Sequence, residues 1–288
     1  MIPTQFDYKA PTTLEEAVAL LASDLDGAKV LAGGHSLIPA MKLRLAQPQL
    51  LVDIARIKSL SYIREAGDQI LIGATTTHYQ LESSDLLKTI CPLLPACAAS
   101  IGDVQVRNKG TIGGSIAHSD PAGDWPAAIL ALDAELVLVG TSGERTVKAE
   151  NFFVDLLTTD LQPGEILREI RITKPSGRFG QAYQKVPHPA SGFAVVGVAV
   201  HLVLNDDGSC KSAGIGVTGV DVKAYRAKAV EAALAGSNLD DSAVTTAVTH
   251  VCDGIDPNSD LYASGDYRCH LAQVHTRRAI QAAKARVK

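Results

Sequence analysis

Two glycine pairs, each followed closely by a serine, are the residues of this sequence best suited to bind an anion. The first pair lies in Gly-Gly-His-Ser at residues 33–36, and the second lies in Gly-Gly-Ser at residues 113–115. Glycines let backbone N–H groups approach an oxyanion without a Cβ atom in the way, and a serine hydroxyl can donate to the same anion. Two such segments facing one another are expected to chelate a diphosphate. Each pair taken singly is also compatible with a plain turn.

A branched side chain at Gly33 or Gly113 is then expected to block the anion while leaving the protein folded.

The sequence holds no P-loop, nucleophile elbow, zinc-protease or EF-hand motif. Residues 214–219 formally fit G-x-G-x-x-G, but they lie inside an alternating strand pattern, so we interpret them as closely packed strand glycines. His118, Asp120 and Asp124 are close enough to suggest a metal site, but a turn that caps the following helix explains them better.

The composition is that of an ordinary globular protein. Of the 288 residues, 46% are hydrophobic and 20% are charged, and the net charge is −4. This acidic balance gives no electrostatic reason to expect nucleic acid or an anionic membrane as a partner. The N-terminus has no signal-peptide pattern, and no apolar run reaches the roughly 18 residues of a membrane helix. We therefore expect no membrane span and a cytoplasmic location.

The cysteines favour neither a disulfide framework nor a metal cluster. Their number is odd, and the sequence contains no C-x-x-C spacing. We therefore interpret all of them as buried or half-buried thiols. The five residues are Cys91, Cys97, Cys210, Cys252 and Cys269.

The elements that position the glycine pairs follow from periodicity and capping patterns. The first pair is expected in a turn between a strand at 28–32 and a helix at 37–45, and the second follows one helical stretch at 79–101. Residues 174–180 are expected to be a linker. Other expected helices are 12–23, 124–132, 223–235, 241–251 and 264–286, and other strands are 51–54, 62–64, 69–73, 135–139, 145–147, 166–172, 193–204 and 211–220. These elements predict an α+β protein with a boundary near residue 175 and a further division near residue 56.

Two long segments carry a resemblance to a known family. AGGHSLIPAMKLRLAQP at 32–48 and RNKGTIGGSIAHSDPAGDWPA at 107–127 resemble the FAD-binding medium subunit of molybdenum hydroxylases. That family includes the carbon monoxide dehydrogenase medium chain and the FAD domain of xanthine dehydrogenase, and the similarity covers essentially the whole chain. It implies an α+β fold: a PCMH-type (vanillyl-alcohol-oxidase-like) FAD domain in two α/β subdomains at 1–55 and 56–175. A C-terminal domain at 176–288, with an antiparallel sheet and three helices, would follow.

The resemblance also implies where FAD is held without a covalent bond. The main chain of both glycine segments would hold the diphosphate, Asp124 would bind ribose or nearby hydroxyls, and Leu167 would lie near the adenine. Lys185 and Phe193 would approach the isoalloxazine, and no catalytic or metal-ligating residue is implied. The implied cofactor-binding residues are Ala32, Gly33, Gly34, His35, Ser36, Leu37, Thr111, Ile112, Gly113, Gly114, Ser115, Asp124, Leu167, Lys185 and Phe193.

The function that the resemblance implies is electron transfer within a larger enzyme. A large subunit with molybdopterin and a small subunit with two [2Fe-2S] clusters would be the partners, in a dimer of heterotrimers. In the carbon monoxide members, the stretch before a flavin-facing Tyr is rich in Lys and Arg. Here residues 185–193 read KVPHPASGF, which weakens a carbon monoxide assignment. The alternatives are a free-standing flavin oxidase of the same fold and a cofactor-free interaction module.

Overall fold

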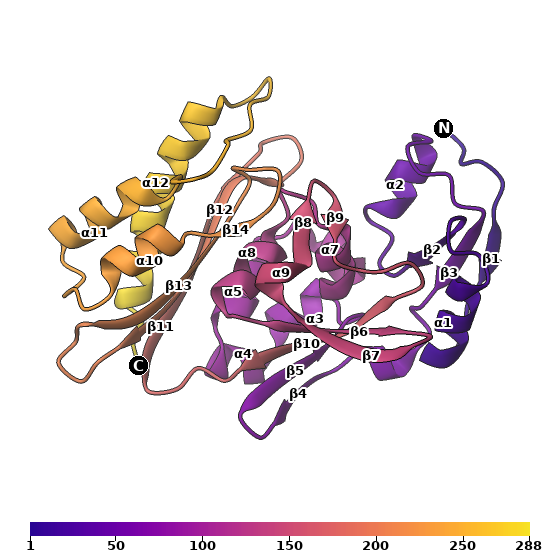
Figure 1. Cartoon of the computed structure of the whole chain (residues 1–288), viewed down its shortest axis with the longest axis horizontal. Helices are drawn as coiled ribbons and strands as arrows, with labels where there is room; N and C mark the ends of the chain where they lie inside the picture. Colours follow the sequence, from indigo (N-terminus) through magenta and orange to yellow (C-terminus); the bar gives the residue numbers. More distant parts are fainter.

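The strands of the computed structural model, which describes residues 1–288, form three main sheets that follow one another along the chain (Figure 1). The N-terminal sheet is parallel, with the strand order β1-β3-β2. Thr13 caps the first helix by accepting a hydrogen bond from the Glu16 N–H, as the capping pattern predicts. The elements of this unit are β1 (Asp7–Lys9), α1 (Leu14–Ala22), β2 (Ala28–Leu31), α2 (Leu37–Lys42) and β3 (Leu50–Asp53).

The central unit is built on a five-stranded antiparallel sheet with the strand order β4-β5-β10-β6-β7. Its helices and sheet enclose the largest apolar cluster of the molecule, which contains the fully buried Trp125 and Phe152. The strands are β4 (Ile63–Ala66), β5 (Gln69–Gly73), β6 (Glu135–Gly140), β7 (Gly143–Lys148), β10 (Ile166–Thr173) and the small pair β8 (Phe153–Asp155) and β9 (Thr158–Thr159). The helices are η1 (Lys58–Leu60), α3 (His78–Ser83), α4 (Asp85–Ile90), α5 (Leu93–Ala99), α6 (Val104–Lys109), α7 (Ile112–His118), α8 (Asp124–Ala131) and α9 (Ala149–Phe152).

The C-terminal unit is an antiparallel sheet in the order β11-β12-β13-β14 with three helices on one face (Figure 1). The expected α+β class and this final arrangement are confirmed. Its elements are β11 (Arg178–Pro187), β12 (Ala194–Leu204), β13 (Cys210–Thr218), β14 (Tyr225–Arg226), α10 (Lys228–Leu234), α11 (Asp241–Ala247), η2 (Val248–His250) and α12 (Gly265–Lys284). None of the helices combines the length and the apolar character that a membrane crossing requires.

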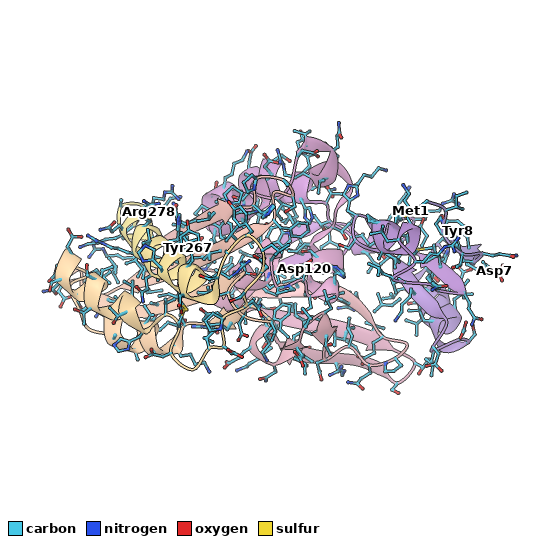
Figure 2. The ribbon with its side chains drawn as sticks, turned by 90° about the horizontal axis from the view of Figure 1, so that it is seen from above. Met1, Asp7, Tyr8, Asp120, Tyr267 and Arg278 are labelled. Atoms are coloured by element: carbon cyan, nitrogen blue, oxygen red, sulfur yellow. A yellow bond between two sulfur atoms is a disulfide. The ribbon has the colours of Figure 1, made fainter.

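The other face of this sheet packs on helix α8 and so joins the two larger units. A Cβ atom at Gly214 would lie 2.1 Å from the Ala131 carbonyl oxygen, and one at Gly216 would lie 2.0 Å from the Ala127 carbonyl oxygen. Only glycine allows a strand to approach a helix this closely. The interpretation of residues 214–219 as packed strand glycines is therefore confirmed. From above, Asp120 lies near the middle of the molecule, between Met1 at one end and Arg278 towards the other (Figure 2).

Several predicted elements were wrong in detail. The single helical stretch at 79–101 is three helices, because Ser84 caps a new helix and Pro92 begins another. The second glycine pair lies within helix α7 rather than in a loop. Part of the expected linker at 174–180 belongs to strand β11, whose first residue is Arg178.

The expectation of five free thiols also needs correction. Cys252 and Cys269 form a disulfide that ties the segment after η2 to helix α12. Cys91, Cys97 and Cys210 are free and buried. The 17-residue separation of the bonded pair follows no recognised motif, so only the packing of α12 against its neighbours reveals it.

The glycines of the two pairs are closed off by the protein's own backbone. A Cβ atom at Gly33 would lie 2.3 Å from the Lys109 carbonyl oxygen, and one at Gly113 would lie 2.6 Å from the Ala74 carbonyl oxygen. Distances below about 3 Å cannot be relieved without moving the backbone. A larger side chain at either position therefore disturbs the packing, which corrects the expectation that it would only block an anion.

Replacing Gly113 by Ala is expected to lower the free energy of unfolding by about 1–3 kcal/mol, because the new methyl group overlaps Ala74. Urea denaturation of the cofactor-free chain measures this change. Ala232→Ser, on the exposed side of helix α10, is the control and is expected to change the value by less than about 0.5 kcal/mol. Equal stability of Gly113→Ala and the wild type would show that this contact is looser than the structure indicates.

A buried polar cluster lies where the central helices meet strands β11 and β12. The Gln181 side chain accepts from the Leu93 N–H at 3.0 Å, and its amide nitrogen lies 3.2 Å from His201 Nδ1. The pKa of His201 is lowered to about 4, mainly by burial; Asp133 opposes this shift and Arg226 contributes to it. The ring is therefore neutral in the folded protein at neutral pH.

This histidine makes stability depend on pH in a defined direction. Between pH 6.5 and 4 the unfolded chain binds a proton at His201 that the folded chain does not, so the free energy of unfolding falls as the pH falls. The contribution reaches about 1.4 kcal/mol per pH unit. His201→Asn removes this titration, and we expect its stability to fall less steeply in urea melts across this window. The matched control is the same change at the exposed His270, and an unchanged slope for His201→Asn would contradict the prediction.

Candidate functional site

The loop between β2 and α2 presents a run of backbone amides that have no partner in the protein. The N–H groups of residues 32–37 donate to no backbone or side-chain acceptor, whereas the next amide, that of Ile38, bonds to the Gly34 carbonyl. Gly34 has a φ of +76°, which residues other than glycine rarely adopt. The loop is only partly buried, so these donors remain accessible to a ligand.

The two glycine segments converge, as their proposed joint role requires. Gly33 packs against Lys109 and Gly110, and a Cβ atom at Gly114 would lie 3.7 Å from the Cβ of Ala32. The second segment is fixed in turn by an antiparallel bridge between Thr77 and Thr111. The sequence-based expectation that distant segments meet at one place is therefore correct.

The main chain of the second segment differs from what was expected of it. Most of its amides already have acceptors: Ile112 donates to Thr76 at 3.0 Å, Gly113 to Ala74 at 2.9 Å, and Ser115 to Thr111 at 3.0 Å. The Gly114 N–H donates to the Thr111 hydroxyl, which caps helix α7. The two main chains therefore differ: the amides of residues 112–115 are already bonded within the protein, whereas those of residues 32–37 and of Thr111 are free.

Two serine hydroxyls complete the group of free donors. Ser36 does not cap helix α2 with its side chain, and the hydroxyl of Ser115 has no hydrogen-bond partner in the protein. Both residues are half-buried. His35, which precedes Ser36, is exposed, so its side chain is not enclosed by the loop. The convergence therefore places amides and hydroxyls at one site, which is suited to an anionic oxygen.

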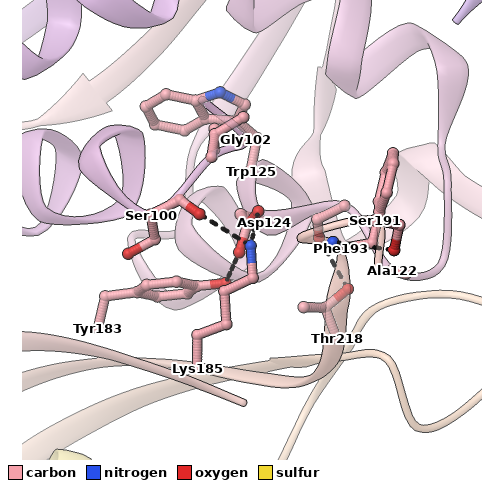
Figure 3. A network of polar contacts seen from close by, with 12 residues as sticks. Ser100, Gly102, Ala122, Asp124, Trp125, Tyr183, Lys185, Ser191, Phe193 and Thr218 are labelled. Carbon is pink, nitrogen blue, oxygen red and sulfur yellow. Dashed lines mark hydrogen bonds and ion pairs between the residues drawn. The ribbon is translucent and has the colours of Figure 1, made fainter. Parts of the chain in front are cut away.

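Asp124 is held in a buried network at the start of helix α8 (Figure 3). Its side chain is 5% exposed and that of Lys185 is 6% exposed. The Lys185 ammonium donates to an Asp124 carboxylate oxygen and to the Ser100 carbonyl oxygen, both at 2.9 Å. The Tyr183 hydroxyl donates to the other carboxylate oxygen at 2.5 Å. A ribose hydroxyl could bind Asp124 only as an additional donor to these two.

The charges in this network are set by burial and by the ion pair together. Burial raises the pKa of Asp124, while the Lys185 cation and the Tyr183 hydroxyl oppose that shift. Burial and the Asp124 carboxylate raise the pKa of Tyr183 well above its usual range, so the phenol stays protonated and acts as a donor. An ammonium has three N–H donors, and two of those on Lys185 are used within the protein.

Sequence reasoning missed Tyr183, although a signal for it was present. Tyr183 and Lys185 are two residues apart on strand β11, so their side chains point to the same face of the sheet. If residues 178–187 had been predicted as a strand, Tyr183 and Lys185 would have been expected on one face, where both contact Asp124 at the start of helix α8. Because residues 174–180 were expected to be a linker, that strand was not expected.

The remaining expected site residues have different surroundings. Phe193 is 46% exposed and follows a short loop in which its N–H donates to the Ser191 hydroxyl. Leu167 is buried in the central core, next to an irregularity in the pairing of β10 with β6. The structure therefore joins Asp124 to Lys185 but shows no direct contact of these residues with Leu167.

Comparisons with known proteins agree with this architecture. Residues 4–175 match the family described as the FAD binding domain in molybdopterin dehydrogenase, and residues 181–283 match the CO dehydrogenase flavoprotein C-terminal domain. The carbon monoxide dehydrogenase medium chain of Hydrogenophaga pseudoflava is 42% identical over 99% of both chains.

Solved structures show the same fold over the full length. A chain of carbon monoxide dehydrogenase from Hydrogenophaga pseudoflava superimposes with a TM-score of 0.97, at 43% identity and with both chains fully covered. A chain of quinoline 2-oxidoreductase from Pseudomonas putida 86 gives a TM-score of 0.93, at 32% identity over 99% of both chains. The chain therefore belongs to the family of FAD-binding subunits of molybdopterin dehydrogenases.

Proposed function

We propose that the chain holds FAD without a covalent bond and places the diphosphate at the free amides of residues 32–37. The observation that carries this proposal is the run of amides without acceptors, at the place where the second glycine segment converges on the first. Hydrogen bonds to a charged group contribute roughly 1.5–3 kcal/mol each, so a few of them suffice for tight binding. The hydroxyls of Ser36 and Ser115 add two donors.

The proposed roles of the other residues follow from their surroundings. Asp124 would accept from a ribose or nearby hydroxyl, and its partner Lys185 keeps one free N–H, which fits a position near the isoalloxazine. Phe193 offers an exposed aromatic face in the same part of the chain. Leu167 would contribute apolar contact to the adenine, and His35 would act through its main chain. The segments 1–55, 56–175 and 176–288 remain our proposed domains.

The proposed activity is the transfer of electrons within a molybdenum hydroxylase complex. FAD supplies the ability to accept electrons singly and to release them in pairs. The residues of this chain bind and orient the cofactor. The partners would be a large molybdopterin subunit and a small [2Fe-2S] subunit, in a dimer of heterotrimers in the cytoplasm. Relatives that are named as medium chains of such enzymes favour this role over a free-standing flavin oxidase.

The substrate of the complex would be chosen by the molybdenum subunit. The two solved neighbours are named for carbon monoxide and for quinoline, although both share the fold of this chain over its whole length. A fold that accompanies such different substrates is suited to a common electron-transfer step.

The purified chain is expected to be yellow, and acid is expected to release its FAD in a one-to-one ratio because no covalent bond holds it. When the chain alone is mixed anaerobically with the substrate of the complex, its flavin should remain oxidised. With its two partner subunits present, the flavin absorbance should bleach. Flavin that stays with the acid-precipitated protein would contradict the non-covalent mode, and bleaching by a small substrate without partners would contradict the subunit role.

A further inference from the structure

His78 lies at the junction of the two glycine segments but has no place in the function proposed above. It is the first residue of helix α3, and its N–H donates to the Gly110 carbonyl oxygen at 3.0 Å. A Cβ atom at Gly110 would lie 2.6 Å from Nε2 of the imidazole. Gly110 is also one of the residues on which Gly33 packs. The His78 ring therefore lies directly behind the contact between the two segments.

Trp125 determines which ring nitrogen of His78 carries the proton. The indole Nε1–H lies 3.0 Å from His78 Nδ1, and an indole nitrogen can only donate. Nδ1 must therefore accept, and the neutral ring carries its proton on Nε2. The pKa of His78 is lowered to about 4, mainly by burial and also by His35 and Arg107, so the ring is neutral at pH 7.

The Nε2–H group has no acceptor in the protein. His78 is only 4% exposed, and no carbonyl, carboxylate or hydroxyl accepts from Nε2. The side-chain nitrogen and oxygen atoms that are fully enclosed without a partner belong to other residues, so Nε2 retains a small opening to solvent. A buried donor without an acceptor is costly, and it is explained if the acceptor comes from a ligand.

The surroundings of Nε2 favour an anionic acceptor. The charged groups that act on the ring are His35 and Arg107, which carry positive or no charge. The free amides of residues 32–37 belong to the loop that packs on the other side of Gly110, through Gly33. Arg107 is itself paired with the Glu82 carboxylate at 2.7 Å, so the free N–H donors are what favours phosphate oxygens here.

We infer that His78 is a further cofactor-binding residue, whose Nε2–H donates to a diphosphate oxygen of FAD, and that Trp125 is the positioning residue that keeps the proton on Nε2. This inference rests on the function proposed above, because that function places the diphosphate at the first glycine segment. It adds a donor from a third segment of the chain, one that neither glycine motif contains.

The test compares FAD binding to the cofactor-free full-length chain and its variants by quenching of flavin fluorescence. His78→Phe removes the donor, and we expect FAD to bind about 10- to 100-fold more weakly. His78→Gln retains an N–H donor and is expected to recover most of that loss. Competition by riboflavin, which lacks the diphosphate, should be the same for all three proteins.

A second set of variants separates binding from folding. His78→Phe leaves the Trp125 N–H without its acceptor, whereas the double variant His78→Phe/Trp125→Phe replaces both polar groups and avoids that cost. Apart from the cavity left by the smaller ring, the double variant therefore carries no unpaired buried N–H, and we expect it to remain folded and still to bind FAD weakly. Trp125→Phe alone should shift the ¹⁵N resonance of Nε2 towards the unprotonated value, because nothing then fixes the tautomer.

The outcomes distinguish this inference from the proposed function. If the wild type binds no FAD, the proposed function fails. If the wild type binds FAD and the double variant binds it equally well, the role of His78 is wrong while the proposed function stands. A loss of riboflavin binding in the same proportion as FAD would place the contact on the flavin side and overturn the diphosphate assignment.

Discussion

The structure depends on a stretch of backbone that folds without satisfying its own hydrogen bonds. The amides of residues 32–37 have no acceptors in the protein, and such a conformation persists only when its surroundings hold it in place. Gly33 provides that support, because its lack of a side chain allows the loop to lie directly on Lys109 and Gly110. The second glycine segment thus acts mainly as a packing surface, and its amides at residues 112–115 are already bonded to the protein.

A second constraint joins the FAD-binding part of the chain to its C-terminal part. The ion pair between Asp124 and Lys185 is almost completely buried and links the start of helix α8 to strand β11. Burying both charges is costly, but removing one partner costs more, about 3–5 kcal/mol, because the other is left uncompensated. The same helix α8 carries Trp125, which fixes His78 behind the glycine segments. One short helix therefore fixes both the buried ion pair and the ring of His78.

The sequence predicted the class of fold because it follows from local patterns, whereas the meeting of the glycine segments was a hypothesis based on their shared composition. Periodicity, capping and glycine content are properties of neighbouring residues. What it missed depends on tertiary contacts. Whether an amide in residues 111–115 is free is decided by carbonyl groups near residue 75, and the cysteine pair at 252 and 269 is joined only by the packing of α12. Tyr183 was missed because its strand begins in the expected linker.

Hydrogen–deuterium exchange at single-residue resolution tests the central claim most directly, because it reports on the amides themselves. In the cofactor-free chain, the amides of residues 32–37 should exchange rapidly, whereas those of Ile112 and Gly113 should already be protected by their bonds to the protein. Binding of FAD should then slow exchange at residues 32–37 by at least about tenfold. Stoichiometric FAD with unchanged exchange in this loop would contradict the account, because the diphosphate would have to be held elsewhere.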